Sequence, residues 1–142
     1  MSAAYILTIG DCDTNANLKS AVWAFDILKY AWPGLELYVV GDGPLRVDLE
    51  AFAVHLGHDD CRVRFLGWPG DITLLIKQAT AVWLTALTGG SELATLASRA
   101  GVPVFAMQNP DLSDVPGVPQ GDHVGLAART LILQDDVARE HR

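Results

Sequence analysis

Short apolar runs alternate with segments of helical periodicity along the whole chain, and this alternation limits the possible folds more than any other feature. The apolar runs are "YILTIG" (Tyr5–Gly10), "LELYVVG" (Leu35–Gly41), "RVRFLG" (Arg62–Gly67), "AVWLT" (Ala81–Thr85) and "VPVFA" (Val102–Ala106). Runs of this length bounded by Gly, Pro and Asp are typical of buried strands. Their alternation with helices favours parallel strands joined by crossovers. We therefore expect an α/β fold, a Rossmann-like three-layer αβα arrangement with a parallel sheet of five or six strands.

Between these runs, apolar residues recur at the spacing of a helix that packs on a core. The first predicted helix lies within Asn15–Gly34, has apolar residues at Leu18, Val22, Phe25 and Leu28, and ends at Pro33-Gly34; the second has the core positions Leu45, Leu49, Phe52 and Leu56 and ends at Gly57. The other predicted helices cover Asp71–Ala79, Glu92–Ala100 and about Val124–Glu140. Pro44 suits the first turn of the second helix, and Ser91 is the expected N-cap of the fourth. The stretch Gln108–Asp122 is rich in Pro, Asp and Gly, and we expect it to be a loop.

The length of 142 residues suits one domain with a hydrophobic core, so we expect a single Rossmann-like domain over residues 1–142. Half of the residues are hydrophobic and 19% are charged, which excludes a disordered chain. Seventeen acids against ten bases give a net charge of −7, and Lys and Arg form no run. This balance argues against binding of nucleic acid through a basic face. An anionic ligand would have to depend on local N–H groups and dipoles.

The two cysteines and the first residues bear on the cellular compartment. Cys12 and Cys61 lie far apart and form no C-x-x-C pair, which is typical of reduced thiols in a cytoplasmic protein. The opening "MSAAYILTIG" has neither the charged region nor the long apolar run of a signal peptide. No segment approaches the ~18 consecutive apolar residues of a membrane span. We expect a cytoplasmic protein without a membrane span.

Ligands of open parallel sheets bind outside the carboxyl ends of the strands. This rule places four loops on one rim: "GDCDTN", "GDGP", "GWPGD" and "LTGGS". The last loop leads into a helix, so its unpaired N–H groups and the positive end of the helix dipole suit an anion. The sequence therefore predicts a phosphate-binding turn at about Thr88–Ser91.

Two stretches together carry a more specific indication. The segment that runs from "LELYVVGDGPLR" through "RVRFLGWPGD" to "AVWLTA", and the segment "RAGVPVFA", closely resemble the donor-binding half of retaining glycosyltransferases of family 4. The stretch "GDHVGLAARTLILQDDVAR" resembles the closing helices of that half. These enzymes have the two-domain GT-B fold, so the resemblance implies that this chain is one half of it. In the family this half holds the nucleotide of a nucleotide-sugar, and an N-terminal domain holds the acceptor.

The resemblance implies a set of nucleotide-binding residues on the rim. In the family, backbone near F-L-G contacts the base, and the G-x-G-P turn lies on the same rim. The implied residues are Gly41, Asp42, Gly43, Pro44, Arg64, Phe65, Leu66, Gly67, Thr88, Gly89, Gly90, Ser91 and Glu92. Trp68, next to F-L-G, is also positioned for a base. The alternative interpretation of the glycines is a tight turn with close helix packing.

The chain departs from the family at the residues that carry its chemistry. Active members have E-x7-E, and the matching positions here are Thr88 and Leu96. The family's Arg and Lys, which neutralise the leaving diphosphate, correspond to Asp11 and about Ala16, although Lys19 is a possible substitute. Cations on a leaving group normally contribute a large share of transition-state stabilisation. We therefore predict no catalytic residue and, at most, weak binding of a nucleotide-sugar.

The first predicted strand begins at Tyr5, so we expect the acceptor domain to be absent from this chain. A GT-B enzyme reacts in the cleft between its two domains. The chain alone should then transfer nothing, and its expected partners are a nucleotide-sugar and an N-terminal acceptor domain or another subunit.

Other candidate residues have ordinary structural explanations. His55, His58, Asp59 and Asp60 include metal-ligand types, but a helix end followed by a solvated turn explains them. Asp11 and Asp13 are interpreted as loop residues, and no G-x-S-x-G motif accompanies Ser91. The sequence predicts neither a metal site nor a cofactor.

Two functions remain open from the sequence. The first is a donor-binding domain of a glycosyltransferase, as a fragment or as a degenerate member of the family. The second is a non-catalytic scaffold or interaction module on the same fold, with its former cleft face packed on another domain or subunit. An ordinary dinucleotide-binding dehydrogenase is disfavoured, because "TIGDCD" after the first strand lacks G-x-G-x-x-G.

Overall fold

A six-stranded, wholly parallel sheet forms the centre of the molecule in the computed structural model, which describes residues 4–57, 61–115 and 117–140. The strands pair in the order β3-β2-β1-β4-β5-β6. Their bounds are β1 Tyr5–Ile9, β2 Glu36–Val40, β3 Val63–Gly67, β4 Ala81–Leu84, β5 Val104–Met107 and β6 Gly117–Val118. The predicted Rossmann-like α/β class and the parallel sheet are confirmed.

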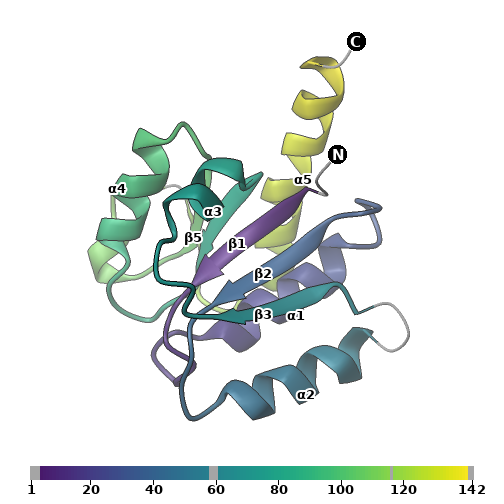
Figure 1. The fold of residues 1–142 in the computed structure, drawn as a ribbon. Helices are drawn as coiled ribbons and strands as arrows, with labels where there is room; N and C mark the ends of the chain where they lie inside the picture. The colour runs from purple at the N-terminus through teal and green to yellow at the C-terminus, as the bar shows by residue number, and fades with distance from the viewer. Residues whose placement is uncertain (1–3, 58–60, 116, 141–142) are drawn as a thin grey trace.

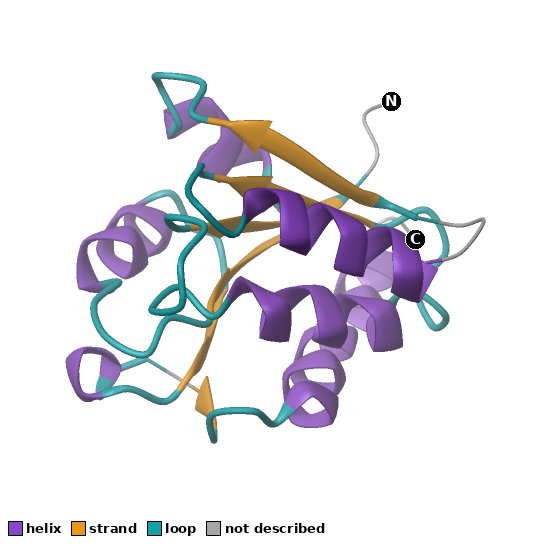
Figure 2. Ribbon diagram, turned by 90° about the horizontal axis from the view of Figure 1, so that it is seen from below, coloured by secondary structure: helices purple, strands orange, loops and turns teal. Residues whose placement is uncertain are grey.

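Helices cover both faces of this sheet (Figures 1 and 2). One face carries α1 (Leu18–Leu28), α2 (Arg46–Gly57) and α5 (His123–Glu140), and the other carries α3 (Thr73–Gln78) and α4 (Ser91–Arg99). The strands are buried on both sides because successive side chains point to opposite faces. Ile6 and Trp83 belong to the core under α1, whereas Leu7 and Val82 belong to the core under α4.

Two linked, buried hydrogen bonds attach α5 to the sheet. The indole Nε1 of Trp83 donates to the Thr130 hydroxyl at 2.9 Å, and this hydroxyl donates to the Leu126 carbonyl at 2.8 Å. Trp83 and Thr130 are both fully buried, so each polar group needs such a partner. These two hydrogen bonds fix the position of α5 relative to β4.

The structure corrects two local predictions. The predicted loop Gln108–Asp122 contains a short 3-10 helix, η1 (Pro110–Leu112), and the sixth strand β6, which pairs with β5. Two residues of strand are too few to show a period in the sequence. Ser91 is not the N-cap of α4: Gly90 is, with φ 98°, and no side chain caps this end.

Candidate functional site

A cavity of about 170 Å³ lies at the carboxyl ends of β1 and β4. After β3 the chain crosses to the other side of β1, so the loops that follow β1 and β4 diverge at this point and leave a crevice. The walls come from the β1–α1 loop and the β4–α4 turn. Its polar lining residues include Asp11, Asp13, Asn15, Thr85 and Thr88. The cavity lies where an open α/β sheet binds ligands, and of the thirteen residues implied by the resemblance only Thr88 and Gly90 line it.

The β4–α4 turn is tied to the β1–α1 loop by Asn15. The Leu87 N–H donates to the Asn15 carbonyl at 2.8 Å, and the Thr88 hydroxyl donates to Asn15 Oδ1 at 2.8 Å. The Asn15 amide donates in return to the Thr88 carbonyl at 3.4 Å. The Thr88 hydroxyl therefore already has a partner, although Thr88 lines the cavity.

On its other side the same turn contacts η1, through two residues that the sequence analysis does not identify. The Gly89 N–H donates to Oδ2 of Asp111 at 2.8 Å. The Asn109 amide donates to the carbonyls of Ala86 and Gly89 at 2.9 and 3.2 Å. The signal in the sequence is "NPD", since Asn before Pro is typical of a side chain that caps a turn. The partner of that turn, some twenty residues earlier in the chain, cannot be read from it.

The charges around the cavity are acidic. Asp11 and Asp13 line it, and no described lining residue is Lys or Arg. The Lys19 ammonium, considered above as a substitute cation, lies 4.9 Å from the centre of the Phe52 ring, over α2. Asp13 Oδ1 accepts the Ala16 N–H at 2.9 Å, and Ala16 is only 6% exposed. The described lining of this cavity therefore offers a diphosphate no neutralising side chain.

The G-x-G-P turn packs against the β1–α1 loop. A Cβ on Gly41 would collide with the Gly10 carbonyl oxygen, and one on Gly43 would lie 2.7 Å from the Cys12 carbonyl oxygen. Across this contact the Cys12 N–H donates to the Asp42 carbonyl at 3.0 Å. The glycines are thus required for close approach of two loops, whatever else they do.

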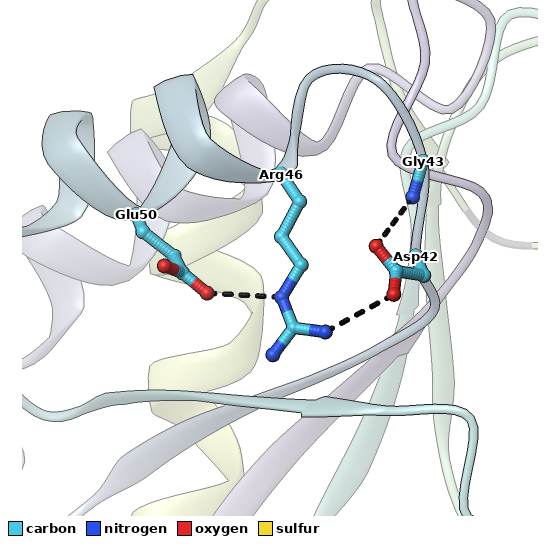
Figure 3. Close-up of polar contacts among 4 residues, drawn as sticks. All are labelled: Asp42, Gly43, Arg46 and Glu50. Carbon is cyan, nitrogen blue, oxygen red and sulfur yellow. Dashed lines mark hydrogen bonds and ion pairs between the residues drawn. The ribbon is translucent and has the colours of Figure 1, made fainter.

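Arg46 holds the side chain of Asp42 in this turn (Figure 3). Asp42 Oδ1 accepts the Gly43 N–H at 2.8 Å, and Oδ2 lies 3.3 Å from Arg46 Nη1. Arg46 Nε donates to Glu50 at 2.9 Å, and this bond together with both carboxylates raises the pKa of the guanidinium. Pro44 is exposed in the same turn. The Asp42 carboxylate is therefore directed into its own turn and towards α2.

The end of β3 presents apolar side chains to solvent beside this turn. Leu66 is 40% exposed and Trp68 is 55% exposed, whereas Phe65 is half-buried against the core. Arg64 Nε lies 3.3 Å from Glu36, along β2. The buried Gly67 accepts the Gly41 N–H at 2.9 Å, which joins the F-L-G and G-x-G-P segments.

The remaining implied residues lie at the start of α4. Ser91 and Glu92 are exposed there, and Ser91 lines a separate hollow of about 330 Å³ together with Asp111. Leu96, at the position of the family's second Glu, is 48% exposed one turn further along the helix. The thirteen implied residues thus form two groups, one around β2 and β3 and one around the β4–α4 turn.

The Cys12 thiol is not activated, and the described residues contain no cluster of metal ligands. Burial raises the pKa of the Cys12 thiol, and the Asp42 carboxylate raises it further, so the thiol stays protonated. No group of three or more metal-ligand side chains occurs among residues 4–57, 61–115 and 117–140. His55 is exposed on α2, and His58, Asp59 and Asp60 lie outside the described residues. Within the same residues, no helix is both long and apolar enough to cross a bilayer.

The family described as "Glycosyl transferases group 1" matches residues 3–136. The chain belongs to this family. The chain is 38% identical over 116 residues to another protein, the lipopolysaccharide core biosynthesis glycosyltransferase LpsD of Rhizobium meliloti (strain 1021). The alignment covers 75% of the chain and 33% of that protein, so the chain spans about a third of the length of this relative.

Solved glycosyltransferase structures share the fold of this group 1 chain. Anabaena Alr3699/HepE in complex with UDP and glucose superposes with a TM-score of 0.84 and 18% identity, over 96% of this chain and 40% of that one. Staphylococcus aureus TarM in complex with UDP gives 0.81 and 12%, over 94% and 29%. The catalytic domain of the cholesterol-α-glucosyltransferase of Helicobacter pylori gives 0.80 and 16%, over 94% and 87%. The predicted half of a GT-B fold is confirmed.

Proposed function

We propose that residues 1–142 form one nucleotide-sugar donor-binding domain of a family 4 glycosyltransferase. The observation that carries this proposal is the cavity between the β1–α1 loop and the β4–α4 turn, at the switch point of a group 1 glycosyltransferase fold. The exposed Trp68 and Leu66 supply an apolar surface for a base on the same rim. UDP is the first nucleotide to test, because it is present in two of the three similar structures named above.

The domain binds its donor weakly and has no catalytic residue of its own. Asp11 stands where a cation would neutralise the diphosphate, and Leu96 cannot accept a hydrogen bond from a ribose hydroxyl. Each charge-assisted hydrogen bond contributes ~1.5–3 kcal/mol, so the loss of several costs orders of magnitude in affinity. Transfer of a sugar then depends on a second, acceptor-binding domain or subunit in the cytoplasm.

Calorimetric titration of the chain with UDP-, GDP- and ADP-sugars tests this function. We expect one of the three to bind with a Kd weaker than about 1 μM, with the others weaker still. Tight and saturable binding would contradict the assignment of the missing charges. Binding of none of them, even at millimolar concentration, would contradict the donor-binding function.

That second outcome would favour a non-catalytic interaction module instead. One observation supports this alternative. Four large apolar side chains on or near the rim are 40% to 55% exposed: Leu66, Trp68, Leu87 and Leu96. Such a surface is suited to packing on another domain or subunit.

A further inference from the structure

A second cavity, also of about 170 Å³, lies between the helices α3 and α4 and is called the α3–α4 cavity below. Its floor is apolar: Ile76 is 4% exposed, and Ile72 and Ala100 are half-buried against the same core. Leu96, which is 48% exposed, also lines it. None of its described lining residues lines the cavity between the β1–α1 loop and the β4–α4 turn, so the two cavities are separate.

The charged side chains that line the α3–α4 cavity are both cations, Lys77 from α3 and Arg99 from α4. No acid lines it among the described residues, although the chain has seventeen acids and only ten bases. A cation in the last turn of a helix suits the helix dipole, and both residues lie in last turns. That preference does not explain why the two cations border the same apolar cavity.

Both cations are available to a ligand. Neither forms an ion pair within the residues that the structure describes. The Thr73 N–H, which the Asp71 carboxylate accepts at 2.9 Å, is the main cause that lowers the pKa of Asp71, and Lys77 is a minor one. Arg99 also lines the hollow of about 330 Å³ beside η1, but it pairs with neither of the two aspartates there.

We propose that the α3–α4 cavity binds a small amphiphilic anion, with a short apolar chain on the floor and a carboxylate at Lys77 and Arg99. Burial of the chain supplies most of the affinity, and the two cations select the sign of the head group. The ligand is small, because pockets for drug-sized ligands measure roughly 300–1,000 Å³. An anionic membrane surface is disfavoured, since the net charge of −7 repels it. The inference is independent of the proposed donor-binding function and adds a second site.

Leu96 makes this cavity suited to an amphiphile. The family resemblance implies a Glu at this position, and a carboxylate there would lie three residues before Arg99 on the same helix, where the two could pair. With Leu96 the lining stays apolar, and the Arg99 guanidinium remains free of such a partner. The departure from the family at this position therefore changes an acidic lining into an apolar one bordered by cations.

Octanoate, octanol and octylammonium test the inference, because they share one chain and differ in the charge of the head group. Each is titrated into the ¹⁵N-labelled chain and followed by NMR. Octanoate should bind about fivefold more tightly than octanol, and octylammonium more weakly than both, with the largest shifts at the amides of Ile76 and Ala100. Equal affinities of the three ligands, or largest shifts on the rim around Trp68, would overturn the inference.

Four variants separate the head-group contact from the apolar contact. Arg99→Gln should weaken octanoate about threefold and leave octanol unchanged, whereas Arg129→Gln, on the exposed side of α5, should change neither. Leu96→Ser should weaken both ligands about tenfold. Leu74→Ser is its control, since Leu74 is 62% exposed on α3 and does not line the cavity. Equal effects within either pair of variants, or a loss of octanol binding in Arg99→Gln, would contradict the proposed site.

Discussion

Two carboxylates, Asp11 and Asp13, face the crevice in which a diphosphate would lie. They lie on opposite sides of Cys12, but only Asp13 is used locally, because its side chain accepts the Ala16 N–H. Asp11 is exposed; its backbone carbonyl accepts the Asp13 N–H at 2.8 Å, but its carboxylate forms no hydrogen bond or ion pair with the described residues. At the scale of single residues, Asp11 is therefore the side chain whose replacement changes the site most while changing the fold least.

Replacement of Asp11 by Arg should raise the affinity for UDP about tenfold or more, because it removes a repulsion and adds a bidentate donor. Asp48→Arg is the control, since Asp48 is an exposed acid in the first turn of α2, away from the cavity. It makes the same change of net charge. Calorimetric titration of both variants with UDP separates the effect of a charge at the cavity from the effect of the net charge of the protein. An equal gain in the two would show that Asp11 does not face the ligand.

His123 makes folding stability depend on pH. Its ring stacks on Trp23 with centroids 5.1 Å apart, and Nε2 lies 3.2 Å from the Ser20 hydroxyl. Burial lowers the pKa of His123 below 6.5, against a smaller opposite effect of Asp122. The unfolded chain then binds the proton more readily than the folded one, so stability falls as the pH drops through and below about 6.5.

The variant His123→Gln tests this dependence, because it keeps a polar side chain and does not titrate. Thermal melts between pH 7.5 and 5.5 should show a smaller decrease of Tm for His123→Gln than for the parent. Identical decreases in the two proteins would assign the pH dependence to other groups.

At the scale of secondary-structure elements, the contact between the β2–α2 turn and the β1–α1 loop is the part of the site that the fold depends on most. Gly41→Ala should lower the free energy of unfolding by roughly 2–4 kcal/mol, because the added Cβ meets the backbone of Gly10. Gly34→Ala is the control for backbone conformation alone, since Gly34 has φ 84° and no atom near the added Cβ. It should cost only about 1 kcal/mol in urea unfolding. Equal costs would mean that the loops do not pack this closely.

The elements also show what a sequence can reveal and what it cannot. Strands such as "YILTI" and helices such as Leu18–Leu28 are read directly, because hydrophobic periodicity is a local property. The strand β6 and the helix η1 carry no hydrophobic period: β6 forms by pairing with β5, and η1 is capped locally by the Asn109 side chain. The rim loops follow from the rule for parallel sheets, but the contact of Asp111 with Gly89 joins two loops through a single hydrogen bond and leaves no pattern.

At the scale of the whole molecule, the net charge of −7 acts on every anion that approaches the rim. Where Lys and Arg side chains hold phosphates, added salt weakens binding, because it screens attraction. Here the described residues of the cavity include no cation and two acids, so salt should screen repulsion instead. The sign of the salt dependence therefore distinguishes a rim that has lost its phosphate-binding cations from an intact one.

We expect the parent chain to bind UDP about two- to threefold more tightly at ~0.3 M than at ~0.02 M ionic strength, because the Debye length falls from above 20 Å to below 10 Å. Asp11→Arg should flatten or reverse this dependence, since it removes a repulsion and adds an attraction, and added salt weakens an attraction. Asp48→Arg, which changes the same total charge, should leave the positive slope in place. Affinity of the parent that falls as salt is added would mean that a cation outside the cavity lining, such as Lys19, moves to the phosphates when the nucleotide binds.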